Sequence, residues 1–213
     1  MQIHISSSSF LNSVPSRALS CQPRKNTCIV SKDACRPRCL TAIAQSLVTL
    51  PITAQDITPE AFAPFGQVIG ATDDGKNFDD TDAALRLDLG TPRFYIMHLP
   101  RRGMTFDRIT YHANVTQCLG GLDPTSWYLA VAAPSGSVQN APAEQDLHAF
   151  KIPSGKFVKL HQGTWHAGPL FQSRESMDFY NLELSDTNQI DHNTHVYSHK
   201  DGLEFEVVAQ DST

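Results

Sequence analysis

Short runs of alternating apolar and polar residues fill most of the chain after residue 90, and this period of two predicts β-strands. The runs are rich in β-branched or aromatic residues, and turn signals such as Gly120-Gly121 and Pro153 with Gly155 separate them. The expected strands are 93–99, 104–112, 115–119, 126–133, 147–152, 157–161, 177–184 and 203–208. Strands this short and close, with almost no helical periodicity, predict an all-β, mainly antiparallel barrel or sandwich.

The segment before these strands predicts two further strands, one short helix and a loop. Residues 47–52 indicate an edge strand, because Pro51 has no N–H to offer a second neighbour. Thr58 as N-cap followed by Pro59 predicts a helix start. Residues 67–69 predict another strand, and the acidic residues 70–82 predict a solvated loop whose spacing does not fit an EF-hand.

Composition adds an asymmetry between the start of the chain and the rest. The chain has 213 residues, 40% of them hydrophobic, which is enough for one core. No apolar run reaches the roughly 20 residues that a membrane span needs. Residues 1–46 carry six Lys or Arg and one acid, so the remainder carries 11 basic residues (17 − 6) and 21 acidic residues (22 − 1). An acidic body without a basic stripe argues against nucleic-acid binding.

Residues 1–46 have the composition of an organelle transit peptide, because they are rich in Ser, contain Arg and hold a single acid. We therefore expect this part to be disordered and the folded domain to span residues 47–210. The expected destination is the plastid, specifically a chloroplast, with the mitochondrion as the alternative. Four of the five cysteines lie in this part, at spacings that match no zinc pattern with a CxxC pair. Only Cys118 remains in the body, so no structural disulfide is expected.

The chemistry-bearing residues gather in two stretches. In the stretch 155–171, Phe157, Lys159 and His161 share one face of a strand, and Gly163 allows a tight turn before His166. We expect this turn to bring His161 and His166 to one cavity. In the other stretch, Arg108, Thr110 and His112 share one strand face, and Gln117 follows.

Together these stretches resemble the two signature motifs of the cupin superfamily, a double-stranded β-helix or jelly-roll barrel. Thr110, His112 and Gln117 stand at the two His positions and the Glu position of His-x-His-x(3,4)-Glu. Gly155, Gly163 and His166 match Gly-x(5)-Pro-x-Gly-x(2)-His, in which His161 replaces Pro. The resemblance implies a cupin barrel with one or two short helices.

Within that superfamily the chain is similar to the ureidoglycolate lyase (ureidoglycolate hydrolase) family over roughly residues 50–185. The similarity lies in His161-x3-Trp165-His166 running into Pro169-Leu-Phe171, in His112-x3-Thr116-Gln117, and in Ala61-Phe62-x2-Phe65-Gly66. The family has an acidic residue where Thr110 stands and a second His in the place of Ala167-Gly168. The resemblance implies release of urea and glyoxylate from ureidoglycolate, in allantoin and purine catabolism.

Such a carbon–nitrogen lyase needs a base for the substrate hydroxyl and an acid for the departing nitrogen, and imidazoles suit both roles. The hypothesis gives the acid–base role to His161, with His112 and His166 also catalytic. A weakly held divalent ion, Ni or Mn, is expected on His112, Gln117 and His166, with no organic cofactor. Arg108 or Arg86 is expected to bind the substrate carboxylate, and Gln117 and Glu183 are expected among the substrate-binding residues as well. Glu183 is expected either to orient a His or to face solvent.

Alternatives remain open at this point. The chain fits another cupin enzyme that acts on a small carboxylic acid, a non-catalytic small-molecule-binding cupin, or an amidohydrolase that releases ammonia. The resemblance also implies a homodimer, with no nucleic-acid or membrane partner. His192, His195 and His199 form a second histidine group, which we interpret as a polar loop because the residues between them are poor helix formers.

Overall fold

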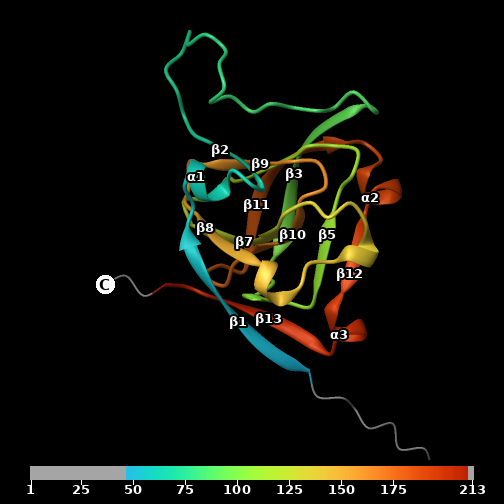
Figure 1. Cartoon of the computed structure of the whole chain (residues 1–213). Coiled ribbons are helices and arrows are strands. Elements are labelled where there is room, and N and C mark those ends of the chain that lie inside the picture. The colour runs from blue at the N-terminus through green and yellow to red at the C-terminus, as the bar shows by residue number, and fades with distance from the viewer. Residues whose placement is uncertain (1–46, 211–213) are drawn as a thin grey trace, which may run out of the picture. The chain divides into compact units, whose positions relative to one another are not determined.

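The computed structural model describes residues 47–210, which form strands with a few short helical turns (Figure 1). The expected transit peptide and its four cysteines lie outside the described residues, and the domain boundary at residue 47 stays a prediction. None of the helices within 47–210 has the length and apolar character needed to span a bilayer.

The strands form two sheets. The larger one has the order β12-β5-β10-β7-β8-β1-β13-β4. Its strands are β1 (Val48–Asp56), β4 (Thr105–Phe106), β5 (Arg108–Tyr111), β7 (Trp127–Ala132), β8 (His148–Ile152), β10 (Trp165–Leu170), β12 (Asn193–Val196) and β13 (Leu203–Val208). The smaller one has the order β2-β9-β6-β11-β3. Its strands are β2 (Gly66–Ile69), β3 (Pro92–Pro100), β6 (Gln117–Gly121), β9 (Phe157–Leu160) and β11 (Ser176–Leu184).

The helical turns are short and lie in the connections. They are α1 (Pro59–Phe62), α2 (Thr187–Ile190), α3 (Tyr197–Lys200) and the 3-10 turns η1 (Val138–Asn140) and η2 (Glu144–Asp146). The predicted N-cap at Thr58 is confirmed, because its Oγ1 accepts a hydrogen bond from the Ala61 N–H at 3.2 Å.

The first strand has one neighbour at each point along its length, and that neighbour changes at Ala54. Residues Val48 to Thr53 of β1 pair in parallel with β13, and Ala54 to Asp56 pair in parallel with β8. Pro51 therefore has a paired strand on one side only, where a missing N–H on the other side breaks no ladder. This agrees with the predicted edge character of residues 47–52, although the whole strand joins β8 to β13 and is not terminal in the sheet (Figure 1).

The two sheets pack face to face around an apolar core. Trp127, Leu129 and Phe150 of the larger sheet and Val158 and Phe179 of the smaller one belong to one buried cluster. The Trp127 and Phe179 rings meet edge to face at 5.3 Å between centroids. The predicted all-β, mainly antiparallel cupin-type barrel is confirmed by this arrangement of curled sheets.

Most predicted strands are present, with shifts of one or two residues at their ends. The expected strand 104–112 is divided into β4 and β5, and a further strand, β10, follows the predicted turn at Gly163 but belongs to the other sheet from β9. The interpretation of the second histidine group as a polar loop holds for His192, which lies between α2 and β12, but was wrong for His195 in β12 and His199 in α3. The poor helix formers between these histidines correctly argued against a single helix that carries all three. They do not argue against a strand, and residues 193–196 form one that pairs with β5.

Candidate functional site

Three neighbouring strands place one polar row on the same face of the larger sheet. Thr110 on β5 lies opposite His166 on β10 and opposite Thr194 on β12. The Thr110 and Thr194 hydroxyls lie 2.8 Å apart and share a hydrogen bond. Because side chains two residues apart share a face, His112 continues this row on one side and Arg108 on the other. His192 lies two residues before Thr194, so the antiparallel register brings it beside His112.

The His112 and His166 rings form the centre of the site, with centroids 5.1 Å apart. The Nδ1 atom of His112 lies 2.6 Å from the Asp191 carbonyl oxygen, and that of His166 lies 3.3 Å from the Thr164 carbonyl oxygen. A carbonyl oxygen only accepts, so each neutral ring donates from Nδ1 and keeps its Nε2 lone pair free. Two imidazole nitrogens are thus left as acceptors within one buried site.

Burial keeps both rings neutral near pH 7. Desolvation, followed by the nearby His112 ring, lowers the pKa of His166 to about 3. Desolvation also lowers the pKa of His112, but the Asp191 carbonyl and the charges of Asp191 and Glu183 act in the opposite direction. His112 is therefore the ring of the two whose protonated form the surroundings support.

Asp191 fixes the short loop that carries His112. Its carboxylate accepts hydrogen bonds from the backbone N–H groups of Ala113 and Asn114, each at 2.8 Å, and from the Asn193 side chain at 3.0 Å. The same residue therefore holds the His112 ring through its carbonyl and the following backbone through its side chain. The sequence motifs contain no sign of this residue.

Gln117 has its amide oriented by a buried network on the smaller sheet. Its Nε2 donates to Asn181 Oδ1 at 3.2 Å and to Glu183 Oε2 at 3.1 Å, so its Oε1 must point the other way. That Oε1 is buried and has no hydrogen-bond partner. Glu183 is 1% exposed and also accepts from Asn188. Of the two expectations for Glu183, solvent exposure is wrong, and its carboxylate orients Gln117.

A cavity of about 450 Å³ opens over the row on β5 and β10. Its lining includes Thr110, His166, His192 and two arginines, Arg102 and Arg108. Arg108 is exposed and donates to the Asp107 carboxylate, through Nε at 2.8 Å and through Nη2 at 3.3 Å. The predicted position of Arg108 beside the histidines is therefore present. Sequence reasoning missed Arg102 and His192 as residues of this site, because both lie in connections between elements and only the tertiary structure shows that they reach this cavity.

Two predicted site residues lie elsewhere. Leu160 is buried in the apolar core, so the next residue, His161, turns to the outer face of the smaller sheet. There its Nδ1 lies 3.0 Å from Lys159 Nζ and its Nε2 lies 3.2 Å from the Ala63 carbonyl oxygen. The expectation that His161 and His166 face one cavity is therefore wrong. Arg86 is also remote, since its Nε pairs with Asp88 at the exposed surface.

The residues at the site fit a weakly held divalent ion at most. Within residues 47–210, no group of three or more His, Cys, Asp or Glu side chains is placed to hold a metal ion. The expected metal site has three donor atoms only if the amide oxygen of Gln117 is counted with the free Nε2 atoms of His112 and His166. That amide oxygen has no hydrogen-bond partner. Three neutral donors suit a borderline cation without binding it tightly.

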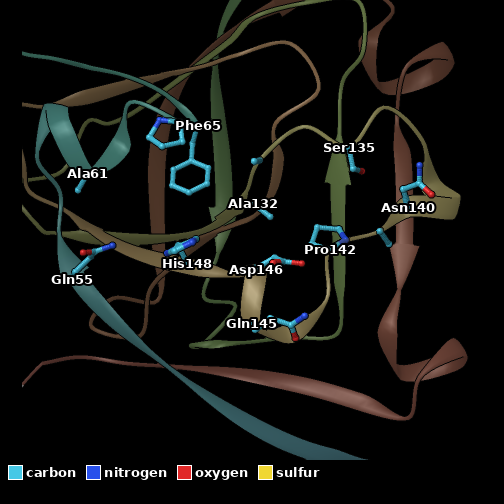
Figure 2. A pocket seen from close by; sticks show the side chains of 13 residues that line it. Gln55, Ala61, Phe65, Ala132, Ser135, Asn140, Pro142, Gln145, Asp146 and His148 are labelled. Atoms are coloured by element: carbon cyan, nitrogen blue, oxygen red, sulfur yellow. The ribbon is translucent and has the colours of Figure 1, made fainter.

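A larger cavity, of about 660 Å³, contains none of the predicted site residues (Figure 2). Phe65 and His148 lie in its lining, with ring centroids 5.2 Å apart. Gln145 and Asp146, from η2, belong to the lining as well. No buried, unpartnered donor or acceptor is found among its lining residues, so chemistry is better supported at the His112–His166 pair.

Comparisons with known proteins identify a family. A family model described as "Ureidoglycolate lyase" matches residues 97–205, which include His112, Gln117, His166 and His192. A solved structure of RmlC from Streptococcus suis in complex with dTDP-D-xylose has a TM-score of 0.31 and 8% identity. That match covers 45% of this chain and 44% of the RmlC chain, less than half of each, and is too weak to add to what the strand order shows. No curated protein matches the chain.

Proposed function

The chain belongs to the ureidoglycolate lyase family, and from this premise we propose that it cleaves ureidoglycolate into glyoxylate and urea. The observation that carries the proposal is the buried pair of neutral imidazoles, 5.1 Å apart, beside a cavity with arginines at its rim. Ureidoglycolate joins a hydroxyl, a carboxylate and a urea nitrogen on one carbon, so its cleavage needs a base close to a carboxylate-binding group.

The proposed base is Nε2 of His112. It takes the hydroxyl proton as the carbon–oxygen double bond of glyoxylate forms and the carbon–nitrogen bond breaks. The electron pair of that bond goes to nitrogen, which receives a proton and leaves as urea, so the step consumes no net proton. Asp191 and Glu183 support the imidazolium that forms, since both raise the pKa of His112 against desolvation.

His166 and His192 assist in different ways. The environment of His166 lowers its pKa to about 3, so we assign it the role of a neutral hydrogen-bond acceptor that orients the substrate. His192 is exposed at the cavity and its ring lies 5.8 Å from that of His112. This position suits a group that passes the proton back to the departing nitrogen, the role that the sequence had indicated for His161.

Arg108 and Arg102 are proposed to bind the carboxylate of the substrate. A guanidinium can hold a carboxylate through two parallel hydrogen bonds. Arg108 already uses two of its donors on Asp107, which fixes its position and leaves further N–H groups for a ligand.

A divalent ion, Ni or Mn, remains part of the proposal as a weakly bound component. His112, His166 and Gln117 would hold it, through the two Nε2 atoms and the amide oxygen, so in the metal-loaded protein the ion would polarise the hydroxyl of the substrate in place of the His112 base. Urea release should fall after exhaustive chelation and return on adding either ion. Urea release that is unchanged after chelation would show that the imidazoles act without a metal.

The test of the function is the product mixture formed from ureidoglycolate by the purified protein. Urea and glyoxylate in equal amounts support the lyase. Ammonia without urea would indicate an amidohydrolase, and the absence of both products would leave a binding protein or another cupin enzyme. A His112→Asn variant assayed beside the wild-type protein excludes a contaminating activity.

The expected homodimer also stays a proposal, and an exposed apolar surface supports it. On the outer face of the smaller sheet, Phe94 is 67% exposed and Ile96 is 59% exposed. Phe94 stacks on Tyr180 at 5.6 Å, and together they border an apolar cavity of about 310 Å³. A contiguous exposed patch of this kind is typical of a protein–protein contact.

A further inference from the structure

Lys159 is a buried lysine with no acidic partner. It lies on β9, on the outer face of the smaller sheet, and is 3% exposed. It forms no ion pair with any residue between 47 and 210, and its neighbour in the sheet register is Cys118, whose thiol is kept neutral by a pKa raised to about 11. An ammonium group buried without a counter-ion is unfavourable, and desolvation accordingly lowers the pKa of Lys159.

His161 provides this amine with a base. Its Nε2 lies 3.2 Å from the Ala63 carbonyl oxygen, which only accepts, so the neutral ring carries its hydrogen on Nε2. The Nδ1 lone pair is then directed at Lys159 Nζ, 3.0 Å away, and accepts a hydrogen bond from it. Burial, followed by the charge of Lys159, lowers the pKa of His161, so the ring is a neutral acceptor near pH 7.

Both side chains line a cavity of about 520 Å³ that shares no residue with the His166 cavity. Ala63, Val68 and Ala84 make part of its lining apolar. The side-chain amide of Gln67 holds the loop that borders this cavity. Its Nε2 donates to the Asp82 carbonyl at 3.0 Å, and its Oε1 accepts from the Ala84 N–H at 3.0 Å. A buried amine, a base and a walled space therefore meet at one place.

We propose that Lys159 is a nucleophilic amine that condenses reversibly with small aldehydes in this cavity. In its uncharged form Nζ adds to the carbonyl carbon, one N–H proton passes through His161 to the carbonyl oxygen, and a carbinolamine forms. Loss of the hydroxyl with a second proton from nitrogen gives an imine and one water. A neutral lysine in an apolar site beside a base is the arrangement that activates amines for this chemistry.

The test uses the full chain with glyoxylate as the aldehyde and cyanoborohydride to reduce any imine to a stable carboxymethyl-lysine. Peptide mapping by mass spectrometry then gives the labelling rate of each lysine. We expect Lys159 to be labelled at least about tenfold faster than Lys156 and Lys200, which are exposed and do not line this cavity. Labelling of Lys159 at or below the rate of these two lysines overturns the proposal.

Two variants separate the roles of the side chains. Lys159→Arg should abolish the fast label and leave the slow labelling of Lys156 unchanged. His161→Gln should slow the label on Lys159 about tenfold, and an unchanged rate would overturn the role of the imidazole. Because glyoxylate is added directly, the labelling does not depend on urea release. If Lys159 is labelled rapidly but the protein forms no urea, the lyase proposal is wrong and the proposal for Lys159 is still supported.

Discussion

At the scale of single residues, two carbonyl oxygens decide the chemistry of the candidate site. The Asp191 and Thr164 carbonyls each occupy Nδ1 of a buried imidazole, which leaves Nε2 free on both His112 and His166. The same kind of contact acts on His161, where the Ala63 carbonyl occupies Nε2 and turns Nδ1 to Lys159. The backbone partner thus decides which ring nitrogen is free, Nε2 on His112 and His166 and Nδ1 on His161.

Replacing the paired imidazoles should remove most of the proposed activity. We expect His112→Asn and His166→Asn each to lower kcat for urea release by about 10²–10⁴-fold, the range for loss of acid–base catalysis. His161→Gln is the matched control and should stay within about threefold of the wild type, since His161 lies on the outer face of the smaller sheet. Steady-state assays of urea release measure this, and the reverse order of effects would contradict the assignment.

The buried imidazoles should also make the free energy of unfolding depend on pH. The pKa of His166 is lowered to about 3 and that of His112 is lowered, so the unfolded chain, with imidazole pKa values of about 6.5, binds protons that the folded chain does not. The contribution of His166 is therefore fully present above pH ~6.5 and falls between about 6.5 and 3, by up to ~1.4 kcal/mol per pH unit, and His112 acts in the same direction.

Denaturant titrations with chelator present, at several values between pH 7 and pH 4, measure this dependence. The His166→Asn variant cannot titrate at this position and should show a clearly shallower fall. If the free energy of unfolding falls with pH at the same slope in the variant and the wild type, burial of His166 does not control the loss of stability in acid.

At the scale of elements, the site depends on the order β12-β5-β10. Thr110 lies between His166 and Thr194 because β5 pairs with both neighbours in antiparallel register. The alternation of side chains along a strand alone correctly placed Arg108, Thr110 and His112 on one face. That alternation could not show that β12 lies beside β5, and for that reason His192 was missed.

Asp191 connects these elements and is a positioning residue. Replacing it by Ala removes the acceptor of two backbone N–H groups, from Ala113 and Asn114. We expect a loss of about 2–3 kcal/mol in the free energy of unfolding, since hydrogen bonds to a charged group contribute about 1.5–3 kcal/mol each and these are partly solvated. We also expect kcat to fall about tenfold with KM nearly unchanged, because the His112 loop is no longer held.

Asp191→Asn is the matched variant, because its amide oxygen can still accept one of these hydrogen bonds. Its stability and kcat should lie between those of the wild type and Asp191→Ala. A kcat for Asp191→Ala equal to that of the wild type would show that the loop holds His112 without this carboxylate.

At the scale of the whole molecule, the two sheets differ in what covers their outer faces. The outer face of the larger sheet packs a second apolar cluster that includes Tyr111, Trp165 and Phe205. The smaller sheet instead leaves Phe94 and Ile96 exposed. We expect this surface to form the contact of the proposed homodimer.

Charge placed on this surface should shift the oligomeric state. Phe94→Lys and Ile96→Lys are expected to convert a dimer into a monomer, because a buried lysine at an apolar contact has no partner. Sedimentation or light scattering measures the mass, and Leu89→Lys is the control, since Leu89 is equally exposed (62%) but lies outside the strands. A wild-type protein that is monomeric, or variants that remain dimeric, would contradict the proposal.

The sequence by itself determined the all-β class, most of the strands, the Thr58 cap and the spacing of His112, Gln117 and His166. These features depend on local periodicity, turn residues and motif spacing, which a single chain displays directly. Tertiary structure decided which faces meet. It sent His161 outward to Lys159 because Leu160 is needed in the core, and it brought His192 and Arg102 to the cavity from connections between elements. Register and sheet order depend on contacts between residues far apart in the chain, so no local pattern contains them.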